Sequence, residues 1–166
     1  MEPNTVKVRC TLLVGAFIIL AGCVQVDVVD RSDAKSSTLI PERALDHNLS
    51  ATGIVFEPPL DEVSRSVIRQ GVDLFVEVEN SGLHDESDVV VQVTLEVEGQ
   101  SAPLAQRQAL IHEIASDETQ RAYFRLTELV DLYSHYVLHV MTVPCVGETF
   151  HGDNQRTFDL YLRPMP

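Results

Sequence analysis

Two segments of the chain alternate apolar and polar residues with a period of two. The first runs from Val72 to Glu79, and the second runs from Val89 to Val97. Successive side chains of a β-strand point to opposite faces, so this alternation predicts two strands that each bury one face. Turn-forming residues follow both runs, at Asn80-Ser81-Gly82 and at Gly99-Gln100-Ser101. Helical spacing fits the pattern poorly, which directs the chain toward an all-β fold.

Five further segments are expected to form strands at short spacing, namely residues 53–56, 105–112, 119–126, 136–143 and 157–162. Together the seven strands predict an all-β fold, a single immunoglobulin-like antiparallel β-sandwich of about seven strands. Two segments stay open. Residues 58–70 form either a long connection or a short helix, and residues 126–134 could contain a helical turn.

The first 23 residues have the layout of an export signal. Lys7 and Arg9 precede an apolar core of ten residues, Thr11 to Leu20, and the tetrapeptide Leu20-Ala21-Gly22-Cys23 closes it. A membrane-spanning helix needs about 20 apolar residues, so this core is too short to cross a bilayer. Residues 1–22 are therefore predicted to be a signal peptide.

The tetrapeptide resembles the lipobox of bacterial lipoproteins. The resemblance implies that Leu20, Ala21 and Gly22 fit the signal peptidase and that Cys23 is the lipidation site and the acylated first residue. It also implies a protein lipid-anchored to a membrane of the cell envelope, on the periplasmic face of the outer membrane or at the cell surface. The alternatives are an ordinary secretory signal with a chance cysteine and a short uncleaved anchor that extends to Val26.

Residues 23–52 are predicted to be the lipidated N-terminus and a flexible tether. The segment is polar and patternless, with Asp-Arg-Ser-Asp-Ala-Lys-Ser-Ser at residues 30–37 and Pro41 soon after. Such a composition cannot bury enough apolar surface to offset the entropy of ordering. Residues 53–166 then have the size of one domain.

The chain is strongly acidic, with 25 acidic and 12 basic residues and a formal net charge of −13. Loss of Glu2, Lys7 and Arg9 with the signal would leave 24 acidic and 10 basic residues, a charge near −14. This field repels nucleic acid and anionic lipid surfaces. The expected partners are the membrane, through the lipid anchor, and an envelope protein or a surface polymer, with no nucleic acid.

One cysteine is left without an intramolecular partner, because Cys10 would leave with the signal and Cys23 would be acylated. We expect Cys145 to be a buried structural thiol, with pairing between chains or thiol reactivity as the alternatives.

The order of the strand and turn segments resembles the CARDB-like modules of bacterial and archaeal surface proteins, an immunoglobulin-like family. The matching pieces are residues 76–82, 89–95, the turn at 116–118 before 119–126, residues 136–140, and Glu148 leading to Asp153-Asn154. The sequence departs from the family at Ser134 and His135, where a glycine usually precedes the strand. The resemblance implies a sandwich and, by analogy, a role in adhesion.

No enzyme motif stands out in the sequence. Asp153 occupies the position where a phosphate loop after Gly147 would need lysine, and His112-Glu113 lacks the second histidine of a zinc protease. We therefore expect no catalysis and no obligate cofactor, and a membrane-anchored binding, adhesion or assembly module. The alternative is a calcium-dependent ligand-binding protein or an enzyme that uses the acidic loops.

Two acidic loops are expected at one end of the sandwich, residues 84–88 and residues 148–154. Calcium prefers six to eight hard oxygen ligands, and the loops supply candidates in Asp85, Glu86, Asp88, Glu148, Asp153 and Asn154. Solvated acidic surface is the other reading of these residues. His135 and His139 are expected to face outward from a strand, about 13 Å apart.

Overall fold

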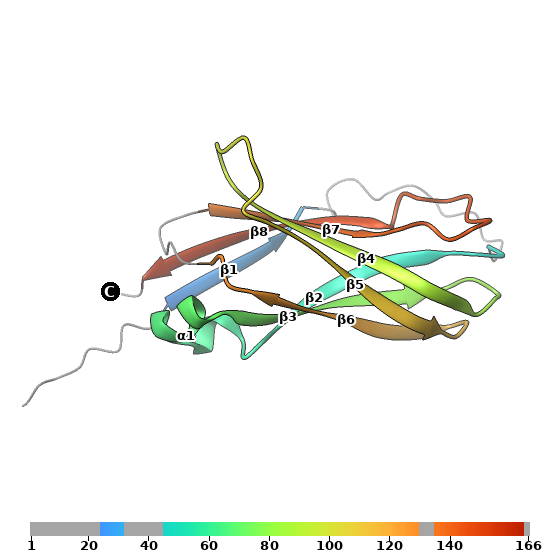
Figure 1. Cartoon of the computed structure of the whole chain (residues 1–166), viewed down its shortest axis with the longest axis horizontal. Coiled ribbons are helices and arrows are strands. Elements are labelled where there is room, and N and C mark those ends of the chain that lie inside the picture. The colour runs from blue at the N-terminus through green and yellow to red at the C-terminus, as the bar shows by residue number, and fades with distance from the viewer. Residues whose placement is uncertain (1–23, 32–44, 130–134, 165–166) are drawn as a thin grey trace, which may run out of the picture.

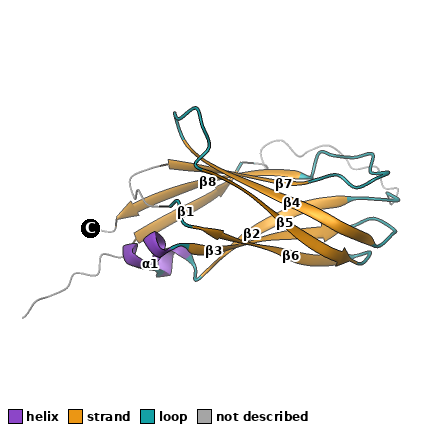
Figure 2. Cartoon of the chain, viewed as in Figure 1, coloured by secondary structure: helices purple, strands orange, loops and turns teal. Residues whose placement is uncertain are grey.

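The computed structural model describes residues 24–31, 45–129 and 135–164, which form a sandwich of two antiparallel sheets (Figure 1). The larger sheet contains, in order, β1 (Val24–Asp30), β8 (Gln155–Pro164), β7 (His135–Thr142), β4 (Glu86–Val97) and β5 (Ala105–Ile114). The smaller sheet contains, in order, β2 (Leu49–Glu57), β3 (Val72–Asn80) and β6 (Glu118–Leu126). Figure 2 shows that helix is confined to the region between β2 and β3.

The strand order, apart from β1, is that of an immunoglobulin-like sandwich. β2, β3 and β6 take the places of strands A, B and E, and β4, β7 and β8 take those of C, F and G. β5 follows β4 in the chain, in the place of strand D. It pairs with β4 rather than with β6, so it extends the larger sheet. The predicted all-β sandwich is confirmed, with all seven expected strands present and β1 added.

The predicted alternation of buried and exposed side chains is confirmed in β3 and β4. Val76, Val91, Leu95 and Leu138 lie between the sheets and are each at most 1% exposed. Burying such a side chain contributes about 1.5–3 kcal/mol relative to leaving it in water. The sandwich is therefore held by an apolar core filled from both sheets.

The tether predicted for residues 23–52 is wrong for two of its parts. Residues 24–30 form β1, which pairs with β8 from Val24↔Pro164 to Asp30↔Phe158, and β2 begins at the buried Leu49 rather than at residue 53. Val26 packs against the core, so the segment buries more than its acidic composition indicates. The predicted signal peptide, Cys23 and residues 32–44 lie outside the described residues.

Residues 58–70, for which a long connection or a short helix was expected, contain two short helices. The 3-10 helix η2 (Leu60–Glu62) is followed by α1 (Arg65–Gln70), and Leu60, Val63 and Ile68 are buried in the core. Residues 127–129 are not helical, and residues 130–134 lie outside the described part. Neither described helix is long and apolar enough to cross a membrane.

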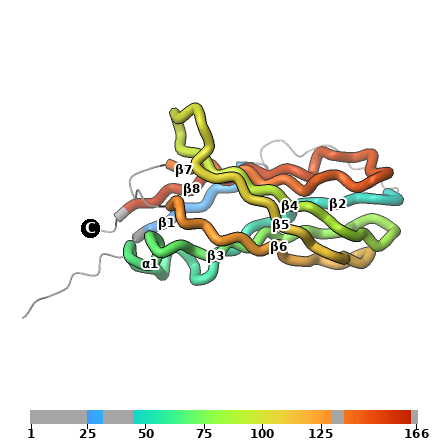
Figure 3. Tube along the Cα trace, viewed as in Figure 1, coloured from blue at the N-terminus to red at the C-terminus, as the bar shows by residue number. Residues whose placement is uncertain are grey.

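The two ends of the sandwich carry different elements. Because β1 and β8 are antiparallel, Val24 lies beside Pro164, at the end of β8 farthest from the loop that precedes β8. Figure 3 shows this end beside α1 and the C-terminus, whereas the β3–β4 and β7–β8 connections gather at the opposite end. The start of β1 and the β7–β8 loop are thus separated by the length of the larger sheet.

Candidate functional site

The end of the sandwich at which β2, β4 and β8 begin is here called the tip, and it consists of residues 45–48, 81–86 and 143–154. Backbone hydrogen bonds join its segments. Ser81 N donates to Asn48 O at 3.0 Å, and Ala51 N donates to Asp153 O at 3.1 Å. Gly82 permits the close approach, since a Cβ there would lie 2.8 Å from the Asn48 nitrogen. The loops of the tip therefore form one connected surface.

Glu148 fastens the β7–β8 loop to the start of β2. Its side chain is buried, and Oε1 accepts hydrogen bonds from Leu49 N at 2.9 Å and from Asn154 Nδ2 at 3.1 Å. Its other oxygen, Oε2, accepts from Cys145 N at 3.0 Å. Three donors thus satisfy the carboxylate, which explains how a charged group is tolerated at a buried position.

Three oxygens of the tip are buried without a hydrogen-bond partner in the part of the chain that the structure describes, Oδ1 of Asn48, Asp153 and Asn154. Asn48 Nδ2 donates to Ser81 Oγ at 2.8 Å and to Asp153 Oδ2 at 3.2 Å. Burial raises the pKa of Asp153, although the hydrogen bond from Asn48 acts in the opposite direction. Buried acceptors of this kind can be satisfied by water or by a cation.

A second group of polar side chains in the tip brings together nitrogen, oxygen and sulfur. His47 Nδ1 lies 2.6 Å from Glu86 Oε1. A ring nitrogen of His47, a carboxylate oxygen of Glu86 and Cys145 Sγ all lie within 4.8 Å of one another. Burial, followed by the negative charges of Glu148 and Glu86, raises the pKa of the Cys145 thiol to about 12. At neutral pH the thiol is therefore protonated and a poor nucleophile.

The outer surface of the tip carries exposed apolar side chains. Val146 is 95% exposed and Leu83 is 56% exposed. In the same tip, the rings of His47 and His84 lie 5.1 Å apart at an angle of 34°. Exposed apolar side chains and imidazole rings are groups that a partner protein can contact.

Five of the six residues proposed as calcium ligands lie in the tip, and Asp88 lies outside it. Glu86 is at the first position of β4 rather than in a loop. Asp85 Oδ1 accepts a hydrogen bond from Ser116 N at 2.9 Å. Asp88 lies within β4 with φ of 52° and its carboxylate 3.8 Å from His112. Calcium binding stays a prediction.

His47 was not among the site residues predicted from the sequence, because its position falls within the predicted tether. Cys145 was predicted to be a lone thiol, whereas its sulfur lies near Glu86 and Glu148. One signal in the sequence could have found this group: all these residues flank strand ends that chain order places at one end of the sandwich.

A separate network of charged side chains joins β1, β7 and β8. Asp159, which is buried, pairs with Arg31, and its Oδ1 lies 2.6 Å from His135 Nε2. His135 Nδ1 lies 2.7 Å from Glu98 Oε2, and its ring stacks on Tyr161 at 4.3 Å. Burial disfavours the protonated ring most strongly, but the bonds to Glu98 and Asp159 outweigh it and raise the pKa of His135.

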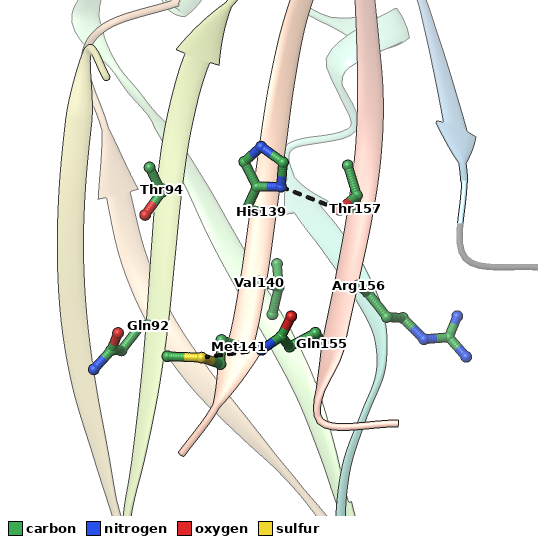
Figure 4. Close-up of a pocket in the computed structure, with 8 residues that line it drawn as sticks. All are labelled: Gln92, Thr94, His139, Val140, Met141, Gln155, Arg156 and Thr157. Carbon is green, nitrogen blue, oxygen red and sulfur yellow. Dashed lines mark hydrogen bonds between the residues drawn. The ribbon is translucent and has the colours of Figure 1, made fainter. Parts of the chain in front are cut away.

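The outer face of the larger sheet carries a shallow groove open to solvent (Figure 4). Gln92 and Thr94 of β4 form one side, and His139 Nδ1 lies 3.1 Å from Thr157 Oγ1 on the other side. Figure 4 shows that Arg156 extends away from the other labelled residues, and its side chain donates to Asp30 Oδ2 at 2.6 Å. The groove lacks the convergent polar groups of a deep ligand site.

Comparisons with known proteins give little guidance. No protein-family model matches the chain, and no curated protein matches it. A crystal structure of a Bordetella pertussis protein provisionally named ApaA is similar at 15% identity and a TM-score of 0.38, over 75% of this chain and 98% of that chain. The function is therefore inferred from the tip's own geometry.

Proposed function

We propose that the protein is a lipid-anchored envelope protein that binds a partner protein through its tip, without catalysis. The lipobox resemblance at residues 20–23 supports the anchor. The described structure supports the orientation, since β1 begins at the residue after Cys23 and that end of the sandwich is opposite to the tip. An anchor at Cys23 would leave the tip directed away from the lipid.

The observation that carries this proposal is the exposure of Val146 and Leu83 on loops that hydrogen bonds join to one another. Val146 is 95% exposed, so a partner that covered it would bury apolar surface and gain binding free energy. The tip also exposes the acidic side chains of Asp46 and Asp85, and the whole chain carries a net charge of −13. A partner surface with an apolar pocket and a basic rim would match both properties.

Cross-linking from the tip tests this function. A photoreactive residue at position 146 of the full-length chain, expressed in cells, should give a protein adduct on illumination. The same residue in place of Leu110, which is 47% exposed on β5, serves as the matched control. The proposal predicts an adduct from position 146 that Leu83→Asp abolishes. No adduct from position 146, or an equal adduct from position 110, would contradict it.

Calcium-dependent ligand binding is the second candidate function. The buried unpartnered Oδ1 atoms of Asn48, Asp153 and Asn154 favour it, because calcium accepts carboxylate and amide oxygens alike. Glu148 is not expected to be a calcium ligand, because its oxygens already accept hydrogen bonds from Leu49, Asn154 and Cys145. We therefore rank calcium below partner binding.

A further inference from the structure

Three side chains from distant parts of the sequence present metal-ligand atoms to one point in the tip. His47 precedes β2, Glu86 begins β4, and Cys145 follows β7. Their ligand atoms, a ring nitrogen, a carboxylate oxygen and Sγ, all lie within 4.8 Å of one another. Within the residues that the structure describes, this is the one group of histidine, cysteine and acidic side chains with such spacing.

We propose that His47, Glu86 and Cys145 bind one Zn²⁺ ion, with water in the fourth position. Zinc sites in proteins combine thiolate, imidazole and carboxylate ligands in tetrahedral geometry. Calcium and magnesium take oxygen ligands and do not use a thiol. The mixed donor set thus selects a zinc-class ion over the hard cations, and it uses a different set of atoms from the calcium site considered above.

The spacing of the three ligand atoms is compatible with a single ion. Bonds of about 2.0–2.3 Å in tetrahedral geometry place ligand atoms roughly 3.5 Å apart. His47 Nδ1 and Glu86 Oε1, at 2.6 Å, would move apart, and the widest pair would close by about 1 Å from its present 4.8 Å limit. The side chain of His47 is 30% exposed, so a cation can reach the group from solvent.

Neighbouring residues hold two of the ligands in place. Glu148 accepts the backbone N–H of Cys145 at 3.0 Å and fixes the turn that carries the thiol. Gly147, with φ of 96°, lies against His47, and a Cβ at this position would be 2.9 Å from His47 Cδ2. Glu148 and Gly147 thus act as positioning residues. The carboxylate of Glu148 is already engaged, which leaves the fourth ligand position to water.

The charges balance when the ion binds. Cys145 gives up its thiol proton to solvent, and His47 coordinates as neutral imidazole through one ring nitrogen. The thiolate and the Glu86 carboxylate then neutralise the two charges of Zn²⁺. The cation also removes the repulsion between the sulfur and the carboxylates that surround it.

Zinc binding to the purified full-length chain tests the proposal. After removal of metals with a chelator, Zn²⁺ alone should raise the melting temperature in proportion to the logarithm of its excess over the dissociation constant. Cys145→Ser and His47→Gln should each weaken zinc binding by at least about tenfold, the lower limit seen when even an outer partner of a metal site is lost. Calcium at the same concentration should give no comparable shift.

Cobalt binding gives a spectroscopic signal that reports the metal–thiolate bond itself. A purely structural role of Cys145 would not produce this signal. Co²⁺ should give a thiolate-to-metal absorption band in the parent and in His112→Gln. His112 is the matched control because it also faces a carboxylate, Asp88 at 3.8 Å, but has no thiol nearby. Because Cys10 and Cys23 also carry sulfur, the band assigned to the site is the difference between the parent and Cys145→Ser.

Several results would overturn the zinc site. These are the absence of a zinc shift in the parent, an equal shift in Cys145→Ser, or a cobalt band that survives that change. If Cys145→Ser fails to fold by circular dichroism, His47→Gln keeps the thiol and decides the question by its zinc affinity. Zinc binding requires neither the lipid nor the partner protein, so its failure would leave the proposed function untouched.

Discussion

Glu148 illustrates at the scale of one residue how an acidic side chain can serve structure. Its carboxylate accepts hydrogen bonds from Leu49, Asn154 and Cys145. Asn154 in turn donates to Leu49 O at 2.9 Å, so the side chains form one buried unit. The loop conformation of the tip depends on this unit.

Replacing Glu148 with alanine should therefore destabilise the fold. The change leaves buried donors without an acceptor, at a cost of about 1–3 kcal/mol for each unsatisfied group. Chemical denaturation of the parent and the variant measures the difference. Glu113→Ala, at an exposed position of β5, is the control and should change stability by less than about 0.5 kcal/mol. Equal effects of the two substitutions would show that Glu148 is not a structural anchor.

His135 gives the fold a dependence on pH. Its pKa is raised in the folded protein, so the folded state holds the proton more tightly than the unfolded state. The resulting stability is fully present below the ordinary histidine pKa of 6.5 and is lost as pH rises through the raised value. We expect a loss of about 1 kcal/mol or less, because Glu98 is solvent-exposed.

Denaturation between pH 6 and pH 8 measures this effect, with His135→Gln as the comparison. The variant should lose the part of the pH dependence that the parent shows. The carboxylate partner Asp159 does not affect this measurement. Its pKa is lowered in the folded protein, so its contribution to stability is lost only in acid, below pH 3.8. An identical pH profile in the parent and the variant would contradict the role of His135.

At the scale of elements, β4 carries the pattern that made the fold predictable. Val91→Ala and Leu95→Ala should lower the free energy of unfolding, by about 2–5 kcal/mol for leucine and somewhat less for valine, through lost burial and a cavity. Gln92→Ala and Thr94→Ala, on the outer face, should cost much less. Thermal melts of the four variants test the register. A similar loss in both pairs would mean that the strand does not face the core as described.

The strand β1 makes a second prediction at this scale. A chain that lacks residues 1–31 should be less stable than one that lacks only residues 1–23, by about 2 kcal/mol or more. The loss comes from the burial of Val26 and from the pairing of β1 with β8. Equal melting temperatures of the two chains would show that β1 adds nothing to the sandwich.

The sequence predicted the strands that alternate over many residues and missed structure where the pattern is short. In β3 and β4 every second residue is apolar, so the buried face could be identified without coordinates. In β1 the alternation covers only Val24 to Val28, and Val29 and Asp30 break it. Chain order places His47, Glu86 and Cys145 at one end of the sandwich, but the distances between them could not be predicted, because they depend on how three loops meet.

At the scale of the whole molecule, the proposed anchor and the tip lie at opposite ends of the sandwich. The chain with Cys23→Ser should fail to incorporate labelled palmitate and should leave the membrane fraction or stay unprocessed, because acylation supplies the apolar surface that holds it. Lipid labelling followed by detergent-phase partitioning measures both properties. Cys145→Ser serves as the control and should be labelled like the parent. Labelling of Cys23→Ser at the parent's level would disprove the lipoprotein prediction.

The start of β1 at Val24 leaves no slack between an acylated Cys23 and the folded sandwich. Val24 pairs with Pro164 at one end of β8, and the ten residues of β8, at about 3.3 Å per residue, place the other end roughly 30–35 Å away. A lipid attached there would hold the sandwich directly at the membrane, without a flexible linker between the lipid and the domain. The tip would stand at a fixed height above the bilayer, and only partners whose binding surfaces reach that height could be captured.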